Sequence, residues 1–330
     1  MKRSILNYSA WLTLLVAHAT LGKVYQVLII GGGPAAYSAA ISAANAKLTT
    51  IVFEGQQPGG QPVKAGEIKN FPGHKSINGA ELVSNMREQA EELGAIIVDS
   101  HVVNVNFKQK PFTITTDKNE KFSAQTVIIA SGSEPVKLNC PGENACWGKG
   151  VIVCAKCDGH LFDGKDIAII GGGYSALREL GNLKPFAKQI TLINPDTELS
   201  GPQFLINQTK AENVTILHRT QVIQILEKDG HVNGIEIENK DTKKRTTLPV
   251  QGVLVGLGWK PSSQLFVNQL KLNKEKEIEI TDGDTKTSVP GIFAAGDITN
   301  KSRHQLATAS ASGFTAALDA EAYLREKGFL

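Results

Sequence analysis

The apolar residues of this chain gather in short runs, and two of these runs are followed by the same kind of segment. The run at 24–30 leads into G-G-G-P-A-A at 31–36, and the run at 166–170 leads into G-G-G-Y-S-A at 171–176. A β-branched apolar run that ends at glycine is typical of a buried parallel strand, and the small residues that follow favour a helix. The pattern therefore predicts two strand–turn–helix repeats.

Further apolar and amphipathic segments complete an alternating series of strands and helices. We expect strands at 50–53, 96–98, 102–107, 126–132, 189–193 and 291–297, a hairpin at 111–116 and 121–122, a β-rich stretch at 214–255, and helices at 80–94 and 305–325. Such alternation indicates an α/β fold with parallel sheets. The turn-rich segments 135–150 and 256–261 indicate two crossings between domains.

Both glycine-rich turns match G-x-G-x-x-A. In the first, Gly31 permits the tight turn, Gly33 lets the backbone approach a pyrophosphate, and Ala36 lets the helix pack close to the strand. The N–H groups at the start of the helix would face the phosphates. The strand at 50–53 ends at Glu54, where a carboxylate accepts hydrogen bonds from a ribose. Two such turns predict two nucleotide-binding units.

Cys154 and Cys157 form the only C-x-x-C pair among four cysteines. The pair can close a small disulfide ring, and Asp158 can supply or remove the proton that thiol–disulfide exchange requires. Redox activity is the favoured interpretation, with half of a zinc site or an inert staple as alternatives. Cys140 and Cys146 are expected to be buried, inert thiols, although in an exported protein they could bridge to each other.

The amino terminus has the layout of a secretory signal peptide. Lys2 and Arg3 precede an apolar run at 10–17, and Ala17-His18-Ala19 matches an A-x-A cleavage pattern. A signal peptide at 1–19 would send the protein to the periplasm or an equivalent compartment. The alternative is an uncleaved extension or an organellar presequence, and with no export the protein would be cytoplasmic.

The numbers of basic and acidic residues are nearly equal, so no large electrostatic field is expected around the protein. The chain has 35 basic and 32 acidic residues and a net charge of +3, which favours neither nucleic acid nor an anionic membrane. No internal stretch reaches membrane-spanning length.

Several short motifs along the chain, taken together, match a known family. They are G-x-G-P-A, G-G-Q, E-x-x-N-x-P-G, A-[ST]-G, C-x-x-C-D, a second G-G-G-x-[ST]-A, G-x-F-A-A-G-D and A-A-L-D-A-E-x-Y-L, in the family's order. Over roughly residues 23–326 the chain resembles the low-molecular-weight thioredoxin reductases, which are class II pyridine nucleotide-disulfide oxidoreductases.

The resemblance implies two Rossmann-like three-layer domains and a homodimer. The FAD domain would comprise 23–137 and 259–330, split by an inserted NAD(P)-type domain at 138–258 that carries the C-x-x-C. Because the C-x-x-C and the nicotinamide would share a domain, they would take turns at the flavin as one domain rotates on the other. Thioredoxin or a thioredoxin-like protein would be the partner.

The resemblance also implies residue roles. FAD would be held by Gly31, Gly33, Pro34, Ala35, Glu54, Gly60, Gln61, Asn70, Gly296, Asp297 and Gln305. The nicotinamide cofactor, NADPH or NADH, would be held by Gly171, Gly173, Ser175, Ala176 and Glu179. Asp196, which the family does not share, is added from its own chemistry as an acid near a strand end. Cys154 would attack the substrate disulfide, Cys157 would lie against the flavin, and Asp158 would act as general acid–base.

The sequence departs from the family pattern at the second nucleotide site. The family has H-R-R and a further arginine where this chain has the cation-free segment 194–200, and an acid such as Asp196 repels a 2′-phosphate and suits a free ribose. Other departures are Tyr174 for asparagine, Arg178 for an acid, His160-Leu161 for an aromatic pair and His304 for arginine, whereas Glu179 matches.

Three functions follow from these patterns. The leading one is an FAD-dependent thiol–disulfide oxidoreductase that passes electrons from a reduced nicotinamide through Cys154 and Cys157 to a thioredoxin-like disulfide. The second is a thioredoxin-reductase-like dithiol oxidase that uses oxygen and no nicotinamide. The third is a non-catalytic flavin-binding redox sensor.

Overall fold

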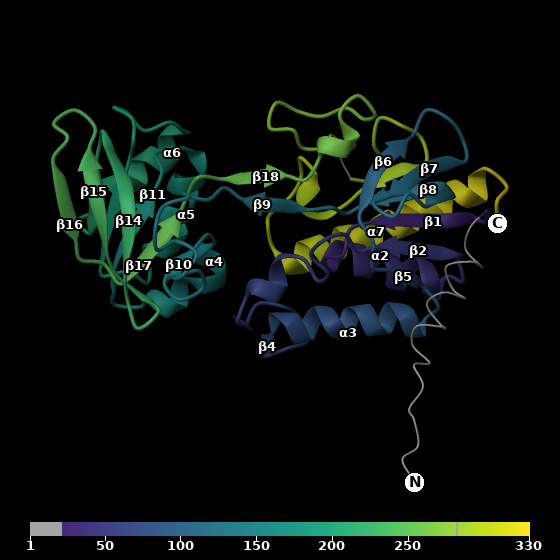
Figure 1. The fold of residues 1–330 in the computed structure, drawn as a ribbon, viewed down its shortest axis with the longest axis horizontal. Helices are drawn as coiled ribbons and strands as arrows, with labels where there is room; N and C mark the ends of the chain where they lie inside the picture. The colour runs from purple at the N-terminus through teal and green to yellow at the C-terminus, as the bar shows by residue number, and fades with distance from the viewer. Residues whose placement is uncertain (1–21, 282) are drawn as a thin grey trace, which may run out of the picture. The chain divides into compact units, whose positions relative to one another are not determined.

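The computed structural model describes residues 22–281 and 283–330, so the predicted signal peptide at 1–19 lies outside the described residues. The chain forms two compact units. The first comprises the described residues up to Glu67 together with Phe71–Ser133 and Pro261–Leu330, and the second comprises Ile68–Asn70 and Glu134–Lys260. The purple beginning and the yellow end of the chain share the first unit, and the teal and green middle forms the second (Figure 1).

The first unit is built on a seven-stranded sheet of order β5-β2-β1-β8-β7-β6, with β19 paired to β8. Its parallel strands are β1 (Val24–Ile30), β2 (Thr50–Phe53), β5 (Ile96–Val98), β8 (Lys121–Ile129) and β19 (Ile292–Ala294), while β7 (Phe112–Thr116) and β6 (Val102–Asn106) run antiparallel. β1 follows the predicted run, because its last four residues are all apolar and buried within the sheet.

One predicted boundary in this sheet was wrong. The segment expected at 121–122 and most of the one expected at 126–132 belong to the single nine-residue strand β8, which ends at Ile129. Its first half alternates between exposed and buried residues where it pairs antiparallel with β7, and its second half is buried throughout beside β1 and β19. The sequence pattern changes within this strand from alternating polar and apolar residues to a continuous apolar run. The two patterns therefore predict two separate strands.

The described part of the first unit contains the helices α2 (Pro34–Asn45), α3 (Gly79–Glu92) and α7 (Leu306–Glu326). The helices α2 and α7 approach each other closely, since a Cβ on Gly313 would lie 2.0 Å from the Ala35 carbonyl oxygen. The small residues of both helices permit this approach. Two apolar cores fill the faces of the sheet, one of them between the sheet and these two helices.

The second unit also has three layers. Its parallel sheet has the order β10-β17-β11-β12-β13, with β10 (Val151–Ile152), β17 (Gly252–Val255), β11 (Asp166–Ile170), β12 (Gln189–Ile193) and β13 (Val214–Leu217). A second, antiparallel sheet holds β14 (Thr220–Lys228), β15 (His231–Asn239) and β16 (Arg245–Leu248), and the helices are α4 (Ala155–Asp158), α5 (Tyr174–Leu183) and α6 (Gln203–Ile206). One apolar core packs on the helices and another on the antiparallel sheet.

The remaining elements are short. They are β3 (Glu67–Ile68), β4 (Ile77–Asn78), β9 (Ser133–Pro135), β18 (Trp259–Pro261), and the 3₁₀ turns Gln61–Lys64, Gly159–Phe162, Asn207–Lys210, Gln264–Phe266 and Gly296–Ile298. β9 and β18 pair with each other where the chain passes from one unit to the other. The α/β class with Rossmann-like parallel sheets is confirmed, whereas the assignment of the two units to FAD and nicotinamide remains a prediction.

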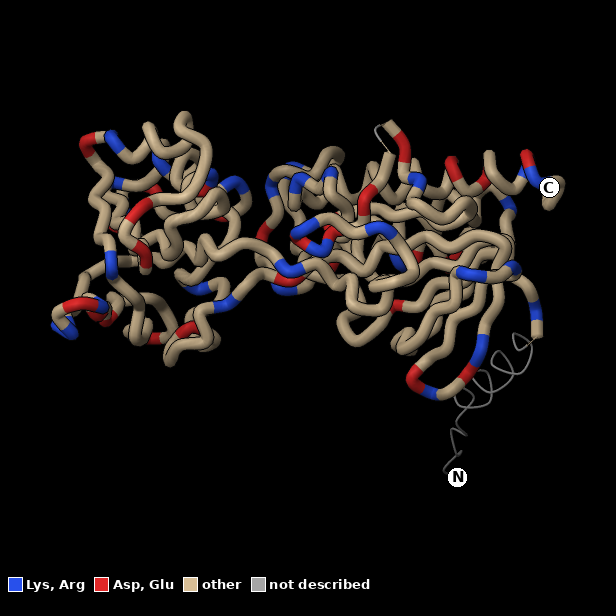
Figure 2. The backbone as a smooth tube through the Cα atoms, turned by 90° about the horizontal axis from the view of Figure 1, so that it is seen from above, with Lys and Arg blue, Asp and Glu red and all other residues tan. Residues whose placement is uncertain are grey.

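Among the described residues, neither the distribution of charge nor the hydropathy of the helices indicates a further binding surface. Lys and Arg are interspersed with Asp and Glu along both units (Figure 2). Within 22–281 and 283–330, every helix is too short or too polar to cross a membrane.

Candidate active site

A disulfide joins Cys154 and Cys157 in the second unit, with their Cα atoms 5.3 Å apart. Cys154 caps the short helix α4, where its Sγ accepts a hydrogen bond from the Cys157 N–H at 3.2 Å. β10 ends two residues before Cys154, so the disulfide lies at the carboxyl edge of the parallel sheet. No group of three potential metal ligands occurs in the described part of the chain.

Asp158 ends the same helix and is half-buried. Burial raises the pKa of its carboxyl group above the ordinary value of 3.8, and the nearby His160 opposes the shift only in part. A carboxyl group that keeps its proton to higher pH is suited to donate that proton to a thiolate. Asp158 therefore has the properties expected of a general acid beside a reactive disulfide.

The first glycine-rich turn forms a backbone cradle. The Gly31 N–H donates to the Phe53 carbonyl oxygen at 2.9 Å, and the Gly59 N–H donates to the Gly32 carbonyl oxygen at 2.7 Å. A Cβ on Gly31, which has φ +135°, would lie 2.2 Å from the Ala130 carbonyl oxygen. Gly60 packs on Gly33, since its Cβ would be 3.2 Å from the Gly33 Cα. No side chain fits at Gly31, and the lack of side chains in the turn leaves the amino terminus of α2 open to a phosphate.

Glu54 follows β2 and is almost completely buried, with 4% exposure. Its Oε1 accepts the Tyr37 hydroxyl at 2.5 Å and the Arg87 Nε–H at 2.9 Å, whereas Oε2 has only a 3.4 Å bond from Arg87. Burial, and then the hydrogen bond to Glu54, raise the pKa of Tyr37 well above its usual range. The carboxylate is thus fixed in place, and Oε2 keeps capacity to accept a ribose hydroxyl.

Sequence reasoning missed both partners of Glu54. Tyr37 lies in the first turn of α2, where the pattern indicated only small residues for packing. Arg87 lies in α3, 33 residues after Glu54, and no local signal connects the two positions. Only the fold brings them together.

The carboxyl-terminal segment adds Gly296, Asp297 and Gln305 to the same unit. Gly296 follows β19, and its Cβ would lie 2.9 Å from the Ala35 Cβ, next to the glycine cradle. The Asp297 Oδ1 accepts the Ser302 hydroxyl at 2.5 Å, and its Oδ2 lies 3.7 Å from the His304 Nδ1. Gln305 caps α7 and donates from Nε2 to the His304 carbonyl oxygen at 2.8 Å.

The residues of the first unit fit a dinucleotide. The glycine cradle leaves space that any Cβ would fill, the start of α2 faces it, and the Glu54 carboxylate stands at the end of the neighbouring strand. The Ser310 Oγ in α7 is buried with no hydrogen-bond partner in the protein, so a polar group is expected to meet it. Gln61 donates to the Ser133 carbonyl oxygen, and Asn70 is exposed in the segment Ile68–Asn70, which belongs to the second unit.

The second glycine-rich turn repeats the hydrogen bonds of the first. The Gly171 N–H, at φ +124°, donates to the Ile193 carbonyl oxygen at 2.9 Å. The Ser200 N–H donates to the Gly172 carbonyl oxygen at 2.8 Å. Gly173 caps α5, with Ser175 and the fully buried Ala176 in its first turn. This turn and the disulfide lie at the same carboxyl edge of one sheet.

The residue directly after β12 is Asn194, and Asp196 stands two positions farther on, exposed. Asn194 is fully buried. Its Oδ1 accepts the Asp196 N–H at 3.2 Å, its Nδ2 donates to the Glu198 carbonyl oxygen at 2.9 Å, and the same nitrogen lies 3.1 Å from the His218 Nδ1. The side-chain amide of Asn194 therefore stabilises its own loop, and Asp196 lies in that loop beyond the end of the strand.

Comparison with known proteins shows the family. Residues 25–313 match the pyridine nucleotide-disulphide oxidoreductase pattern. The thioredoxin reductase of Buchnera aphidicola subsp. Acyrthosiphon pisum (strain APS) is 38% identical over 313 residues, covering 92% of this chain and 98% of that protein. The thioredoxin reductase of Mycolicibacterium smegmatis is 39% identical over 311 residues, covering 94% and 99%. The chain belongs to the thioredoxin reductase family.

A solved structure agrees with this membership. Thioredoxin reductase from Giardia duodenalis superposes with a TM-score of 0.88 at 31% identity, covering 92% of this chain and 99% of that one. With the disulfide in place, the predicted resemblance is confirmed, and the protein is an oxidoreductase of the thioredoxin-disulfide reductase type.

One predicted nicotinamide residue of this thioredoxin reductase makes other contacts. Glu179 is buried, with 3% exposure. Its Oε2 accepts the Ala155 N–H at 2.8 Å, and its Oε1 accepts two bonds from the Arg178 guanidinium at 3.0 and 2.8 Å. The side chain is directed to the redox turn, and both carboxylate oxygens accept hydrogen bonds from the protein.

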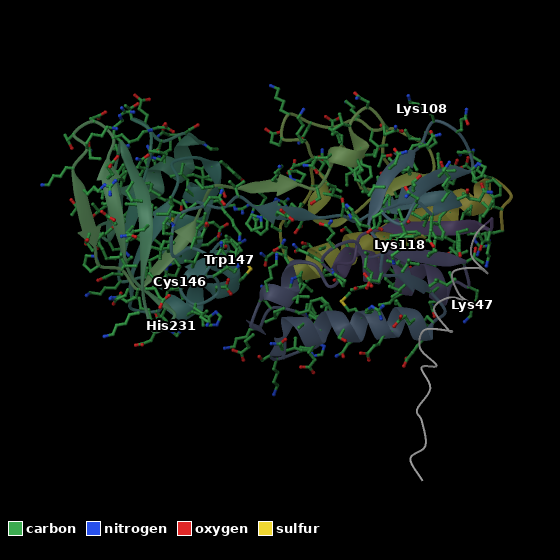
Figure 3. The ribbon with its side chains drawn as sticks, in the orientation of Figure 1. Lys47, Lys108, Lys118, Cys146, Trp147 and His231 are labelled. Atoms are coloured by element: carbon green, nitrogen blue, oxygen red, sulfur yellow. A yellow bond between two sulfur atoms is a disulfide. The ribbon has the colours of Figure 1, made fainter. Side chains whose placement is uncertain are left out.

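The other two cysteines are free thiols, so the suggested bridge between Cys140 and Cys146 is wrong. Cys146, labelled with Trp147 in Figure 3, belongs to the apolar core on the antiparallel sheet. Burial raises the thiol pKa of both cysteines, which keeps them protonated and unreactive. Their chemistry agrees with the interpretation as small, inert residues.

Proposed function

We propose that this protein is an FAD-dependent enzyme that passes electrons from a reduced nicotinamide through the Cys154–Cys157 disulfide to thioredoxin or a thioredoxin-like protein. The observation that carries the proposal is the disulfide at the carboxyl edge of a dinucleotide-type sheet, with the raised pKa of Asp158 beside it. A structural staple needs neither a neighbouring acid nor a nucleotide turn.

The proposed flavin site uses the residues of the first unit and one from the adjoining segment. They are Gly31, Gly33, Pro34, Ala35, Glu54, Gly60, Gln61, Asn70, Gly296, Asp297 and Gln305, to which we add Tyr37 and Arg87 for their bonds to Glu54 and Ser310 for its unpaired, buried hydroxyl. FAD supplies two-electron transfer when bound. The protein orients it through the glycine cradle and the fixed carboxylate of Glu54.

The proposed sulfur chemistry divides between the two cysteines. Two electrons and one proton break the S–S bond and leave a thiol and a thiolate. The thiolate of Cys154 attacks the partner's disulfide to form a mixed disulfide, and Cys157 then attacks Cys154, which re-forms the internal disulfide and releases the reduced partner. Asp158 donates a proton to the leaving sulfur and takes one from the attacking thiol.

For the electron donor we propose NADH in preference to NADPH. The backbone of Gly171, Gly173, Ser175 and Ala176 offers the same phosphate-type turn as the first unit. The segment 194–200 has no cation to pair with a 2′-phosphate, and Asp196 would repel it. A second candidate, the oxygen-using dithiol oxidase, is favoured by this same lack of a basic pocket.

The test is to purify the protein, expected to be yellow, and to mix it without oxygen with NADH, NADPH or a dithiol. We expect NADH to bleach the flavin fully and NADPH to do so more slowly. A Cys154→Ser/Cys157→Ser variant should still bleach with NADH but should fail to reduce thioredoxin. Bleaching by the dithiol alone, with peroxide formed in air, would remove the reductase and leave the oxidase.

We also propose that the enzyme is a homodimer. Helix α7 exposes Phe314 at 46% and Leu318 at 50%, four residues apart and hence on one face. Sedimentation should give a dimer that a Phe314→Glu substitution dissociates, with the flavin spectrum unchanged. A monomeric wild-type protein would contradict the proposal.

Export is proposed from the leader sequence alone. The pattern at 2–19 predicts that mature protein begins at Thr20. Sequencing the amino terminus of protein from its native cells decides this, because a start at Met1 or Lys2 would indicate the cytoplasmic alternative.

A further inference from the structure

The helix α5 reaches the redox turn through one buried carboxylate. The Oε2 of Glu179 accepts the N–H of Ala155, the first residue between the two cysteines, at 2.8 Å. This N–H belongs to the first turn of α4, where helix geometry offers no backbone partner. The bond ties the peptide after Cys154 to the helix that begins at the second glycine-rich turn.

The other oxygen of Glu179 is held from within α5. The guanidinium of Arg178 donates to Oε1 through Nε and Nη2 at 3.0 and 2.8 Å, in a side chain that is itself 34% exposed. The charge of the buried carboxylate is therefore balanced by an adjacent cation. Three N–H donors hold the group in one orientation, which is an arrangement for positioning and not for capturing a mobile ligand.

We infer that Glu179 is a positioning residue for the Cys154–Cys157 turn, and not a nicotinamide ligand. The inference rests on the proposed function only in that the disulfide must open and close during turnover. When the S–S bond is open, the chain between the sulfurs has lost its covalent constraint. The Glu179–Ala155 bond then keeps the turn closed and maintains the effective concentration of one thiol at the other.

Arg178 has a separate part in this arrangement. A lone carboxylate next to the dithiol would disfavour a thiolate, and the guanidinium offsets that effect. The pair thus supplies a hydrogen-bond acceptor at the turn with little net charge.

The test compares Glu179→Gln with Glu179→Leu in the FAD-loaded protein. The Gln amide oxygen can still accept the Ala155 N–H, while Leu fills similar space and cannot. Oxidised and reduced fractions of Cys154 and Cys157 are measured by alkylation and mass after equilibration with dithiothreitol redox buffers, without any nicotinamide. Glu212→Ala, at an exposed acid of the same unit, is the control.

For Glu179→Leu we expect the equilibrium constant for disulfide formation to fall about tenfold, which corresponds to about 30 mV. Glu179→Gln should stay within about twofold of the control in this constant. Because Arg178 is then unbalanced, the midpoint of the pH dependence of Cys154 alkylation should shift to lower pH in Glu179→Gln.

An unchanged equilibrium constant in Glu179→Leu, together with a raised KM for NADH, would overturn the inference and restore the nicotinamide role. If Glu179→Leu does not fold, Glu179→Gln still decides: a raised KM with an unchanged alkylation profile overturns the inference. The thiol equilibrium needs no nicotinamide or thioredoxin, so a failure of the proposed electron donor or partner leaves this test intact.

Discussion

The two glycine-rich turns share a backbone and differ in the residue that follows the neighbouring strand. In each turn the first glycine N–H donates to the last residue of that strand at 2.9 Å, and the returning loop donates to the middle glycine at 2.7 or 2.8 Å. Oε2 of Glu54 in the first unit can accept a further hydrogen bond from a ligand. The side-chain amide of Asn194 in the second unit instead makes hydrogen bonds to the backbone of its own loop. The repeated backbone provides for phosphates, and the strand-end residue decides what else is recognised.

The second unit has in addition what the first does not: a disulfide at its sheet edge with an acid and a positioning carboxylate. In the proposed function the same architecture holds a cofactor in one unit and carries sulfur chemistry in the other. Five predictions test this contrast.

The largest effect is expected for Asp158→Asn, which removes the acid from the unit that carries the sulfur chemistry. Turnover with thioredoxin should fall about 10²-fold or more, since an amide cannot transfer the proton. Stopped-flow measurement of thiol appearance checks this. Asp163→Asn, at an exposed acid nearby, should leave the rate unchanged, and a normal rate in Asp158→Asn would refute the general-acid role.

The same variant has a stability signature. Burial raises the Asp158 pKa, so the folded protein keeps a proton that the unfolded chain releases. The free energy of unfolding therefore decreases as pH rises from about the ordinary value of 3.8 through the raised pKa. Urea denaturation at pH 4 and pH 7 should show that Asp158→Asn is the more stable protein at pH 7 and loses this pH dependence.

The next effect compares the two turn glycines directly. A Cβ would lie 2.2 Å from a carbonyl oxygen at Gly31 but 2.9 Å from one at Gly171, both at positive φ. Gly31→Ala should lower the free energy of unfolding by about 3 kcal/mol and abolish the yellow colour of bound flavin. Gly171→Ala should lower it by about 1 kcal/mol and leave the colour unchanged. Denaturation and flavin absorbance measure both, and equal effects would show that the turns are not distinguished by packing.

A smaller effect is expected at the strand end of the first unit. Glu54→Gln removes the charge that holds Tyr37 and Arg87, and FAD should bind about tenfold more weakly. Flavin release measured by fluorescence gives the dissociation constant. Equal affinity in the variant would mean that this carboxylate does not contact the cofactor.

The smallest effect is expected at the second strand end. Asp196→Arg replaces the exposed acid by a cation and should improve NADPH use relative to NADH by about fivefold, the size of an exposed ion pair. The ratio of the two kcat/KM values measures it. An unchanged ratio would show that the 2′-phosphate, if bound, lies elsewhere.

Sequence patterns were most successful where burial imposes a simple period. β1, β11 and β12 match the expected residues because the last four residues of each strand are buried, and the strand stops at a glycine or at a turn. β8 was divided because its first half has one exposed face. The helix α7, expected at 305–325, runs from Leu306 to Glu326.

The sequence alone determined the α/β class, the two glycine-rich turns and the redox pair, because local spacing fixes backbone turns and short disulfides. Only the tertiary structure decided that Arg87 and Tyr37 hold Glu54, that Asn194 closes its own loop, and that Glu179 meets the turn after Cys154. Hydrogen bonds between groups far apart in the sequence depend on which helices the fold places beside which strand ends. The hydrophobic periodicity of the sequence does not predict that placement.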